Sequence, residues 1–306
     1  MPKIVILGVF VADTAYRAER QPRMGETILG RSFVLGPGGK GSNQSVAAAM
    51  AGGEVHFITR LGCDPFAEMA RATWAKAGVH PQVTDDPDSY TGAAYIFVED
   101  ATGDNAIIIA PGAAGRISVA DVEARRDLIA GAGVFITQLE QPMEAALAAL
   151  RIARAGGART ILNPAPAAPL SDEMLALCDI VTPNESEAEG ITGLKVTTPD
   201  QAEAAARALR ARGAGAAIIT LGEQGALFHD GTRTVHVPAL NAGPVVETTG
   251  AGDAFNGGLA VALAEGQDPV AAVRFGCATA AISVTRPGTA PSMPARTEIE
   301  ALLARR

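Results

Sequence analysis

One acidic residue late in the chain follows a run of small residues and is a candidate for catalysis. Asp253 stands in "TTGAGDAFNGG" (residues 248–258), directly after Gly250, Ala251 and Gly252, and an apolar helical pattern follows at once. Backbone N–H groups at a helix start lack partners and carry the positive end of the dipole, so they bind anions. An Asp beside such a site can take a proton from a hydroxyl group, as phosphoryl transfer to an alcohol requires.

A helix cap is the alternative role for Asp253. Asp is favoured at the N-cap position because its carboxylate accepts hydrogen bonds from the first free N–H groups of a helix. A cap alone does not require the small residues that precede Asp253. Their presence favours the catalytic interpretation.

A second glycine-rich stretch, "GPGGKGSN" (residues 36–43), contains a lysine but is not a phosphate-binding Walker loop. Lys40 is followed by Gly41 instead of Ser or Thr, and Val34 occupies the position of the first glycine. A tight turn before a helix remains the alternative for this stretch. The dinucleotide fingerprint is also missing, because Phe255 stands where its third glycine belongs, which argues against a nicotinamide-dependent oxidoreductase.

Composition narrows the class of protein further. The 306 residues carry a formal net charge of −8 without a block of like charge, which argues against nucleic-acid binding. Three cysteines and four histidines offer neither a disulfide framework nor a Cys/His metal site. The apolar run from Ile4 to Ala12 is too short to span a bilayer, and no cleavage site follows. We therefore predict a cytoplasmic protein with no membrane partner.

The elements that must position these residues follow from periodicity. After residue 130, strand patterns at "GVFITQ", "ARTILN", "DIVTP" and "AAIITLG" alternate with helical patterns. This alternation predicts an α/β fold, with a doubly wound, mostly parallel sheet flanked by helices. We expect one domain over residues 1–306, with "KIVILGVFVAD" as a single opening strand and a helix at 44–51.

Two strand-rich insertions interrupt the first half of the chain. They fall at about residues 14–34 and 90–110, the second being a hairpin with the turn "EDATGD". We predict that they pair as a small β-strand lid.

Polar and glycine-rich segments follow the predicted strands. Ligands of open parallel sheets bind beyond the carboxyl ends of the strands, so we expect these segments to converge at one edge. The segments are Asp13, 36–43, 138–140, Asn163, 183–187, 220–225 and 248–253.

Four of these segments resemble the signatures of the ribokinase-like (PfkB) carbohydrate kinases, in the order of that family. They are "GPGGKGSNQSVAAA", "PNESEAEGITG", "ITLGEQGA" and "ETTGAGDAFNGGL", and the resemblance runs from about residue 3 to the C-terminal region. It implies ATP-dependent phosphorylation of a hydroxyl group on a small sugar, most closely ribose or a related pentose or deoxypentose. It also implies Mg²⁺ with the nucleotide, K⁺, and a strand lid that forms a homodimer.

The resemblance also implies roles for single residues of the reacting site. Asp253 matches the catalytic base, and Gly250, Ala251 and Gly252 match the anion hole. The residues that match sugar-binding positions are Asp13, Gly39, Lys40, Asn43 and Glu140.

Further matches concern the nucleotide and the metal ions. Asn184 and Glu187 match an N-x-x-E motif near the phosphates and Mg²⁺, with Glu187 as the metal ligand. Thr220, Gly222 and Gly225 match the nucleotide-binding loop, and Cys277 falls near the adenine pocket, where a buried apolar role is the alternative. The implied K⁺ ligands are Glu247, Thr249, Ser283, Arg286, Gly288 and Ser292.

The chain departs from the family pattern at two positions. Val11 stands where related kinases place an Asn that contacts the sugar, and Glu247 replaces an Asp at the monovalent-cation site. The identity of the sugar therefore stays open at this point. A nucleoside kinase, another sugar kinase of this family, or a catalytically silent sugar- or nucleotide-binding protein of the same fold are the alternative functions.

Overall fold

The first strand buries alternate residues on opposite faces of a sheet. In the computed structural model, which describes residues 2–305, β1 (Ile4–Leu7) lies inside a nine-stranded sheet. Ile4 and Ile6 pack into the core on one face, and Val5 and Leu7 pack into the core on the other. A strand covered on both faces reads as a continuous apolar run, which explains "IVIL".

The large sheet confirms the predicted architecture. Its other strands are β4 (Val55–Leu61), β5 (His80–Asp85), β8 (Val134–Thr137), β9 (Arg159–Leu162), β10 (Ile180–Val181), β11 (Ala216–Thr220), β12 (Ala226–His229) and β13 (Thr234–Val237). The order is β13-β12-β11-β10-β9-β8-β1-β4-β5, and the strands from β11 to β5 pair in parallel. Two features were not predicted from the sequence: β5 at one edge of the sheet, and the antiparallel hairpin of β12 and β13 at the other edge.

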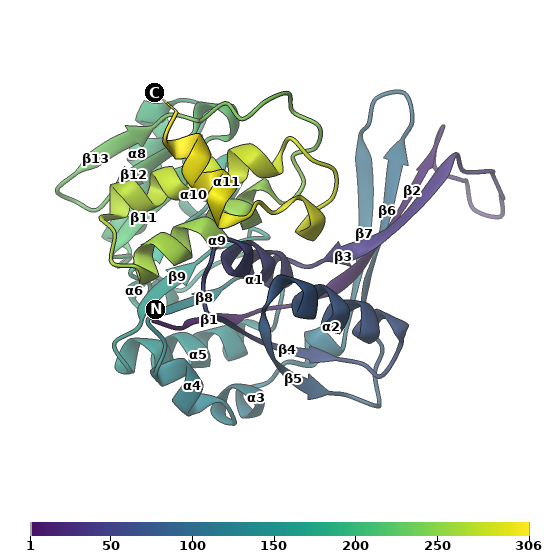
Figure 1. The fold of residues 1–306 in the computed structure, drawn as a ribbon, viewed down its shortest axis with the longest axis horizontal. Helices are drawn as coiled ribbons and strands as arrows, with labels where there is room; N and C mark the ends of the chain where they lie inside the picture. Colours follow the sequence, from purple (N-terminus) through teal and green to yellow (C-terminus); the bar gives the residue numbers. More distant parts are fainter. Residues whose placement is uncertain (1, 306) are drawn as a thin grey trace.

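Helices cover both faces of the sheet (Figure 1). One face carries α1 (Lys40–Met50), α2 (Pro65–Ala77), α9 (Ala251–Ala264), α10 (Pro269–Ser283) and α11 (Arg296–Leu303). The other face carries α3 (Val119–Glu123), α4 (Arg126–Ala130), α5 (Met143–Ala155), α6 (Asp172–Ala176), α7 (Glu185–Thr192) and α8 (Pro199–Ala211). None of the helices within residues 2–305 has both the length and the apolar character needed to cross a bilayer.

Glycines let α9 pack closely between α1 and α10. A Cβ on Gly257 would lie 2.5 Å from Ala47 Cβ in α1, and a Cβ on Gly258 would lie 2.9 Å from Thr279 Cβ in α10. The two helix backbones therefore approach α9 more closely than any larger residue permits. This packing sets the position of the α9 N-terminus relative to α1.

Four strands form a second sheet that projects from the α/β body (Figure 1). They are β2 (Val11–Ala18), β3 (Ser32–Gly38), β6 (Thr91–Glu99) and β7 (Asn105–Gly112), in the order β3-β2-β6-β7. The predicted lid therefore exists as a separate sheet. The prediction of one opening strand was wrong, because the apolar run divides into β1 in the large sheet and β2 in the lid.

Candidate active site

The first turn of α9 opens onto a cavity. Gly250 is the N-cap residue and has φ of 81°, a left-handed conformation that glycine adopts without strain. The N–H of Ala251 donates to Thr248 O at 3.1 Å, and the exposed Gly252 continues the turn. The other N–H groups in a first helical turn lack intrahelical partners, so the backbone beside Ala251 is open to an anion.

Asp253 lies in this first turn but does not cap the helix. The cap position belongs to Gly250, without a side-chain hydrogen bond. The Asp253 carboxylate is instead buried and accepts hydrogen bonds from Asn43 Nδ2 and Gln44 Nε2, both at 3.0 Å. Burial raises the pKa of Asp253, while the Lys40 ammonium and the two amides oppose the rise. The capping alternative is therefore wrong.

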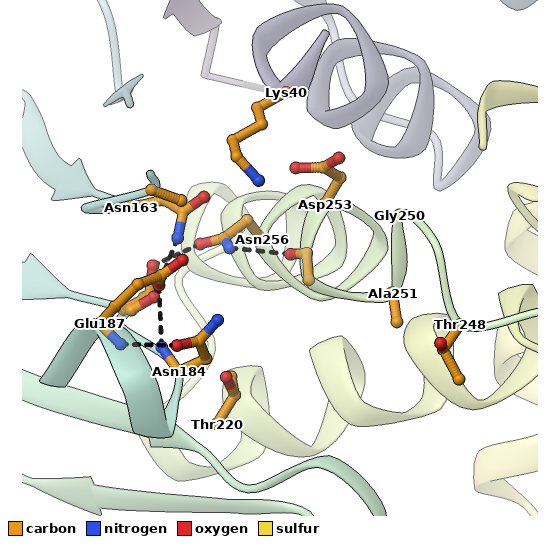
Figure 2. A pocket seen from close by; sticks show the side chains of 13 residues that line it. Lys40, Asn163, Asn184, Glu187, Thr220, Thr248, Gly250, Ala251, Asp253 and Asn256 are labelled. Carbon is orange, nitrogen blue, oxygen red and sulfur yellow. Dashed lines mark hydrogen bonds between the residues drawn. The ribbon is translucent and has the colours of Figure 1, made fainter. Parts of the chain in front are cut away.

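Lys40, the first residue of α1, reaches the same cavity. Gly39 before it has φ of 86°, and a Cβ there would collide with the chain that follows β1. Figure 2 shows the Lys40 side chain extending into the cavity beside Asp253. Burial disfavours the charged ammonium, but Asp253, Glu140 and Glu187 outweigh burial and raise the pKa of Lys40. The side chain is a cation enclosed by carboxylates, in contrast to an ordinary surface lysine.

Asn184 and Glu187 form a capping box at the start of α7. Glu187 N donates to Asn184 Oδ1 at 2.8 Å, and Asn184 N donates to Glu187 Oε2 at 2.9 Å. Both side chains also line the cavity (Figure 2), and burial raises the pKa of Glu187. The pair stabilises the helix start and presents a carboxylate to the cavity.

The cavity has a volume of about 150 Å³ and collects segments that lie far apart in the sequence. Among the predicted site residues, its lining includes Lys40, Asn184, Glu187, Thr220, Gly250, Ala251, Gly252 and Asp253. The structure adds Asn163, which the sequence marks as a polar residue after a strand, and also Ala165, Thr182, Thr248 and Asn256.

Asn256 is a site residue that the sequence analysis missed. Its Nδ2 donates to Gly252 O at 2.8 Å, and its Oδ1 accepts from Thr182 Oγ1 at 2.7 Å. It therefore ties the first turn of α9 to the end of β10. The sequence signal for Asn256 is its polar side chain, four residues after Gly252 and followed by the apolar part of the same helix.

The predicted sugar-binding carboxylates, Asp13 and Glu140, lie outside the described lining of the cavity but close enough to Asp253 to feel its charge. The Asp13 carboxylate on β2 occupies the space that a Cβ on Gly38 would fill. Burial raises the pKa of Asp13 to about 6, and the charges of Asp253 and Glu247 add to the rise. Burial likewise raises the pKa of Glu140 to about 7, against the opposing charge of Lys40.

Val11 lies on the same face of β2 as Asp13, because side chains alternate along a strand. Val11 is only 5% exposed, and its Cγ1 lies against Gly92 of β6. The side chain presents no donor or acceptor at this position.

Glu247 joins the segment before α9 to the loop after α10. Its Oε2 accepts a hydrogen bond from Gly288 N at 2.8 Å, and its N–H donates to Val284 O at 3.2 Å. Residues that are remote in sequence thus lie beside this carboxylate.

The other predicted K⁺ ligands lie in the same region but make different contacts. Ser283 and Ser292 donate their hydroxyl protons to local carbonyl groups at 2.9 Å and 2.7 Å. The Arg286 guanidinium pairs with Glu298, and Thr249 is exposed between Glu247 and α9. Among the predicted ligands, Glu247 is the one whose side chain bonds across to the loop after α10.

The predicted nucleotide loop lies between β11 and β12. Thr220 ends β11 and lines the cavity, and the short helix η2 (Gly222–Gln224) follows. Gly225 has φ of 94°, and a Cβ there would lie 2.6 Å from Ala239 N. Cys277 is buried in the α10 core, where burial raises its pKa to about 12, and the described lining of the cavity does not include it. This placement favours the apolar role of Cys277.

No three His, Cys, Asp or Glu side chains are grouped as a metal site in residues 2–305. Mg²⁺ in nucleotide sites is usually held by one or two carboxylates together with phosphate oxygens. Glu187, a buried carboxylate on the cavity wall, fits that mode of binding.

A buried carboxylate beside open N–H groups suits phosphoryl transfer to a hydroxyl group, and the doubly wound sheet places both at its carboxyl edge. Fold and site together define a small-molecule kinase. The family model described as "pfkB family carbohydrate kinase" matches residues 1–296. The chain belongs to this family and is a sugar kinase that transfers phosphate to a hydroxyl group.

Curated relatives cover nearly the whole chain. A ribokinase of Haemophilus influenzae is 37% identical over 296 residues, which cover 96% of each chain. A deoxyribokinase of Salmonella typhimurium is 36% identical over 293 residues, which cover 95% of each chain.

Solved structures share the fold. The structure of Arabidopsis thaliana ribokinase complexed with ribose and ATP has a TM-score of 0.93 at 30% identity, covering 100% of this chain and 99% of that one. A Thermotoga maritima ribokinase has a TM-score of 0.89 at 33% identity, covering both chains completely.

Proposed function

We propose that this sugar kinase transfers the γ-phosphoryl group of ATP to a hydroxyl group of a free pentose or deoxypentose. The observation that carries the proposal is the buried Asp253 carboxylate beside the open first turn of α9. The ribokinase and deoxyribokinase relatives, and the ribokinase solved with ribose and ATP, support ATP and a pentose as the substrates.

Asp253 acts as the general base in this proposal. The sugar hydroxyl gives its proton to the Asp253 carboxylate as its oxygen attacks the γ-phosphorus of ATP. The bond from the γ-phosphorus to the bridging oxygen breaks, and ADP leaves. The N–H groups of Gly250, Ala251 and Gly252 and the Lys40 ammonium stabilise the negative charge on the phosphoryl group in transfer.

In this proposal the nucleotide phosphates bind along the cavity wall, which Asn184, Glu187 and Thr220 form (Figure 2). Glu187 would hold Mg²⁺, which would neutralise phosphate charge there. The glycines at 222 and 225 have positive φ, which lets the loop after β11 turn beside the cavity, and Gly225 packs closely against the chain after β13.

The sugar is held from the lid side by Asp13, Asn43, Glu140 and the backbone at Gly39. Carboxylates and an amide suit vicinal hydroxyl groups, which donate and accept hydrogen bonds. The apolar Val11 leaves a hydroxyl group beside it without a partner, and such a buried group costs about 1–3 kcal/mol. We therefore propose a deoxypentose, with 2-deoxyribose as the first candidate.

Glu247 and the carbonyl oxygens of the 283–292 loop would hold K⁺, which would order the start of α9. The hydrogen bond between Glu247 and Gly288 already joins these two segments, and this contact supports the proposal. Glu is one methylene longer than the family's Asp, so the ion contact is weaker here.

We also propose that the lid forms a homodimer. One face of its strands exposes large apolar side chains, among them Tyr16 at 43%, Phe33 at 53% and Ile108 at 68% exposure. Contiguous exposed apolar surface of this kind is typical of protein interfaces.

A coupled assay for ADP release, run over free sugars, sugar phosphates and nucleosides, tests the substrate class. We expect turnover with pentoses and the highest kcat/KM with a deoxypentose. The highest kcat/KM with a nucleoside or sugar phosphate would move the chain to another specificity within the family. ATP binding without ADP release for any acceptor would favour the silent binding protein.

A further inference from the structure

Gln44 is a fully buried amide that contacts Asp253 directly. Its Nε2 donates to Asp253 Oδ1 and to Asn163 Oδ1, each at 3.0 Å. An amide nitrogen carries two hydrogens, so these two bonds use both of them. Gln44 belongs to α1, which lies more than 200 residues before Asp253 in the sequence.

A second buried amide determines which end of Gln44 faces the carboxylate. Gln138 Nε2 donates to Gln44 Oε1 at 2.6 Å, and Gln138 is also fully buried. The opposite orientation of Gln44 would place its oxygen against the Asp253 carboxylate, bringing two acceptors together away from water. Gln138 therefore selects the orientation in which Gln44 donates.

The surroundings of Gln138 leave its side chain little freedom. A Cβ on Gly8 would collide with Gln138 Oε1, so the glycine after β1 makes room for the amide. The backbone oxygen of Gln138 accepts from Gln141 Nε2 at 2.6 Å. The chain of contacts thus runs from the end of β8 through α1 to the first turn of α9.

We propose that Gln44, oriented by Gln138, is a positioning residue that keeps the Asp253 carboxylate ionised and in one rotamer for proton transfer. The inference rests on the proposed role of Asp253 as the base. A donor to one oxygen stabilises the charged carboxylate more than the neutral acid, so the bond favours the form that accepts a proton.

Other charged groups face Asp253 from the elements packed around it. Lys40 of α1 favours the ionised carboxylate, whereas Asp13 of β2, Glu140 after β8 and Glu187 of α7 disfavour it. Among residues 2–305, the carboxylate to which Gln44 donates is that of Asp253 alone. Removal of the Gln44 amide therefore changes the environment of Asp253 and leaves the other charges in place.

The test is the pH profile of kcat in Gln44→Met, a variant that keeps the length of the side chain and removes its donors. We expect the acid limb of kcat to move up by about one pH unit, because one charge-assisted hydrogen bond is lost; the rate on that limb falls about tenfold. KM for the sugar and for ATP should stay within about threefold of the wild type. Gln138→Met should move the limb in the same direction by a smaller amount, and it keeps the test available if Gln44→Met does not fold.

Gln141→Met is the matched control. It removes a buried amide of the same cluster, but its bonds go to Thr137 Oγ1 and the backbone of Gln138. It should lower the melting temperature without moving the acid limb. An unmoved limb in both Gln44→Met and Gln138→Met, or an equal shift in Gln141→Met, would overturn the inference.

Asp253→Asn separates this inference from the proposed base. If that variant keeps wild-type turnover, the base assignment itself is wrong. If it is inactive while Gln44→Met keeps the wild-type profile, only the positioning role fails. The double variant should have nearly the same residual rate as Asp253→Asn alone, because both substitutions act through the same carboxylate.

Discussion

The backbone N–H of Lys40 donates a hydrogen bond to Glu140 Oε2 at 2.8 Å. This contact joins the first residue of α1 to the loop after β8 and holds a buried carboxylate beside the Lys40 ammonium. Burial nevertheless raises the pKa of Glu140 to about 7, and that of Asp13 to about 6. Without its substrates, the site therefore encloses more negative charge than Lys40 can balance.

The ligand-free protein should lose stability as the pH rises from about 4 to about 7. Glu140 and Asp13 hold their protons to higher pH in the folded state than in the unfolded state, so the stabilisation present at low pH is lost as the pH passes their folded pKa values. Each carboxyl contributes on the order of 1–3 kcal/mol over this range. Urea unfolding at pH 5 and pH 8 measures the difference, and Glu140→Gln and Asp13→Asn should each reduce it. Equal pH dependence in the wild type and both variants would contradict the prediction.

Asp253→Asn should lower kcat by about 10²–10⁴-fold, because it removes the proton acceptor and keeps the size of the side chain. Its melting temperature should fall, since an amide at this position accepts from only one of Asn43 Nδ2 and Gln44 Nε2. Asp200, an exposed acid in the first turn of α8, provides the matched control, and Asp200→Asn should retain full turnover. Near-wild-type turnover in Asp253→Asn would remove the base from the mechanism.

Val11→Asn should shift specificity from 2-deoxyribose toward ribose. The new amide can bond a hydroxyl group that Val11 leaves unpaired, which is worth roughly 5- to 150-fold in relative kcat/KM. Val11→Ile, which adds no polar group, is the control and should preserve the ranking. If ribose is already the better substrate by tenfold in the wild type, and Val11→Asn leaves the ranking unchanged, Val11 does not determine specificity.

Turnover should increase when K⁺ replaces a large organic cation. The effect should be weaker than in Glu247→Asp, whose shorter side chain restores the family's ligand. Rates measured in K⁺, Na⁺ and tetramethylammonium buffers of equal ionic strength test this. Identical rates in all three buffers would exclude a functional cation at Glu247.

Ile108→Lys should convert a dimer into a monomer, because it places a charge on the exposed apolar face of the lid. Met143→Lys is the control, since Met143 is also exposed but begins α5, outside the lid. Sedimentation equilibrium measures the mass of both variants. A wild-type protein that is monomeric at high concentration would refute the lid dimer.

Several elements could be predicted from the sequence because their signals are local. Pro65 follows the N-cap Asp64, and Gly78 ends the helix in a left-handed conformation, so both ends of α2 carry a signal that can be read from the sequence. The helix predicted at 44–51 begins earlier, at Lys40, because Gly39 takes the cap position with a positive φ. The start of α1 depends on how the chain passes the end of β1. Hydrophobic periodicity carries no information about that tertiary contact.

The sequence by itself determined the alternation of strands and helices, the glycine-rich turns and the residue types at the carboxyl edge of the sheet. Apolar residues repeat every two positions along a strand and about every four along a helix, so their pattern alone predicts strands and helices. Only the tertiary structure decided that the opening run divides between two sheets and that Asp253 bonds Asn43 and Gln44 instead of capping α9. These contacts join residues about 210 positions apart, and their geometry depends on the close packing of α1 against Gly257 of α9.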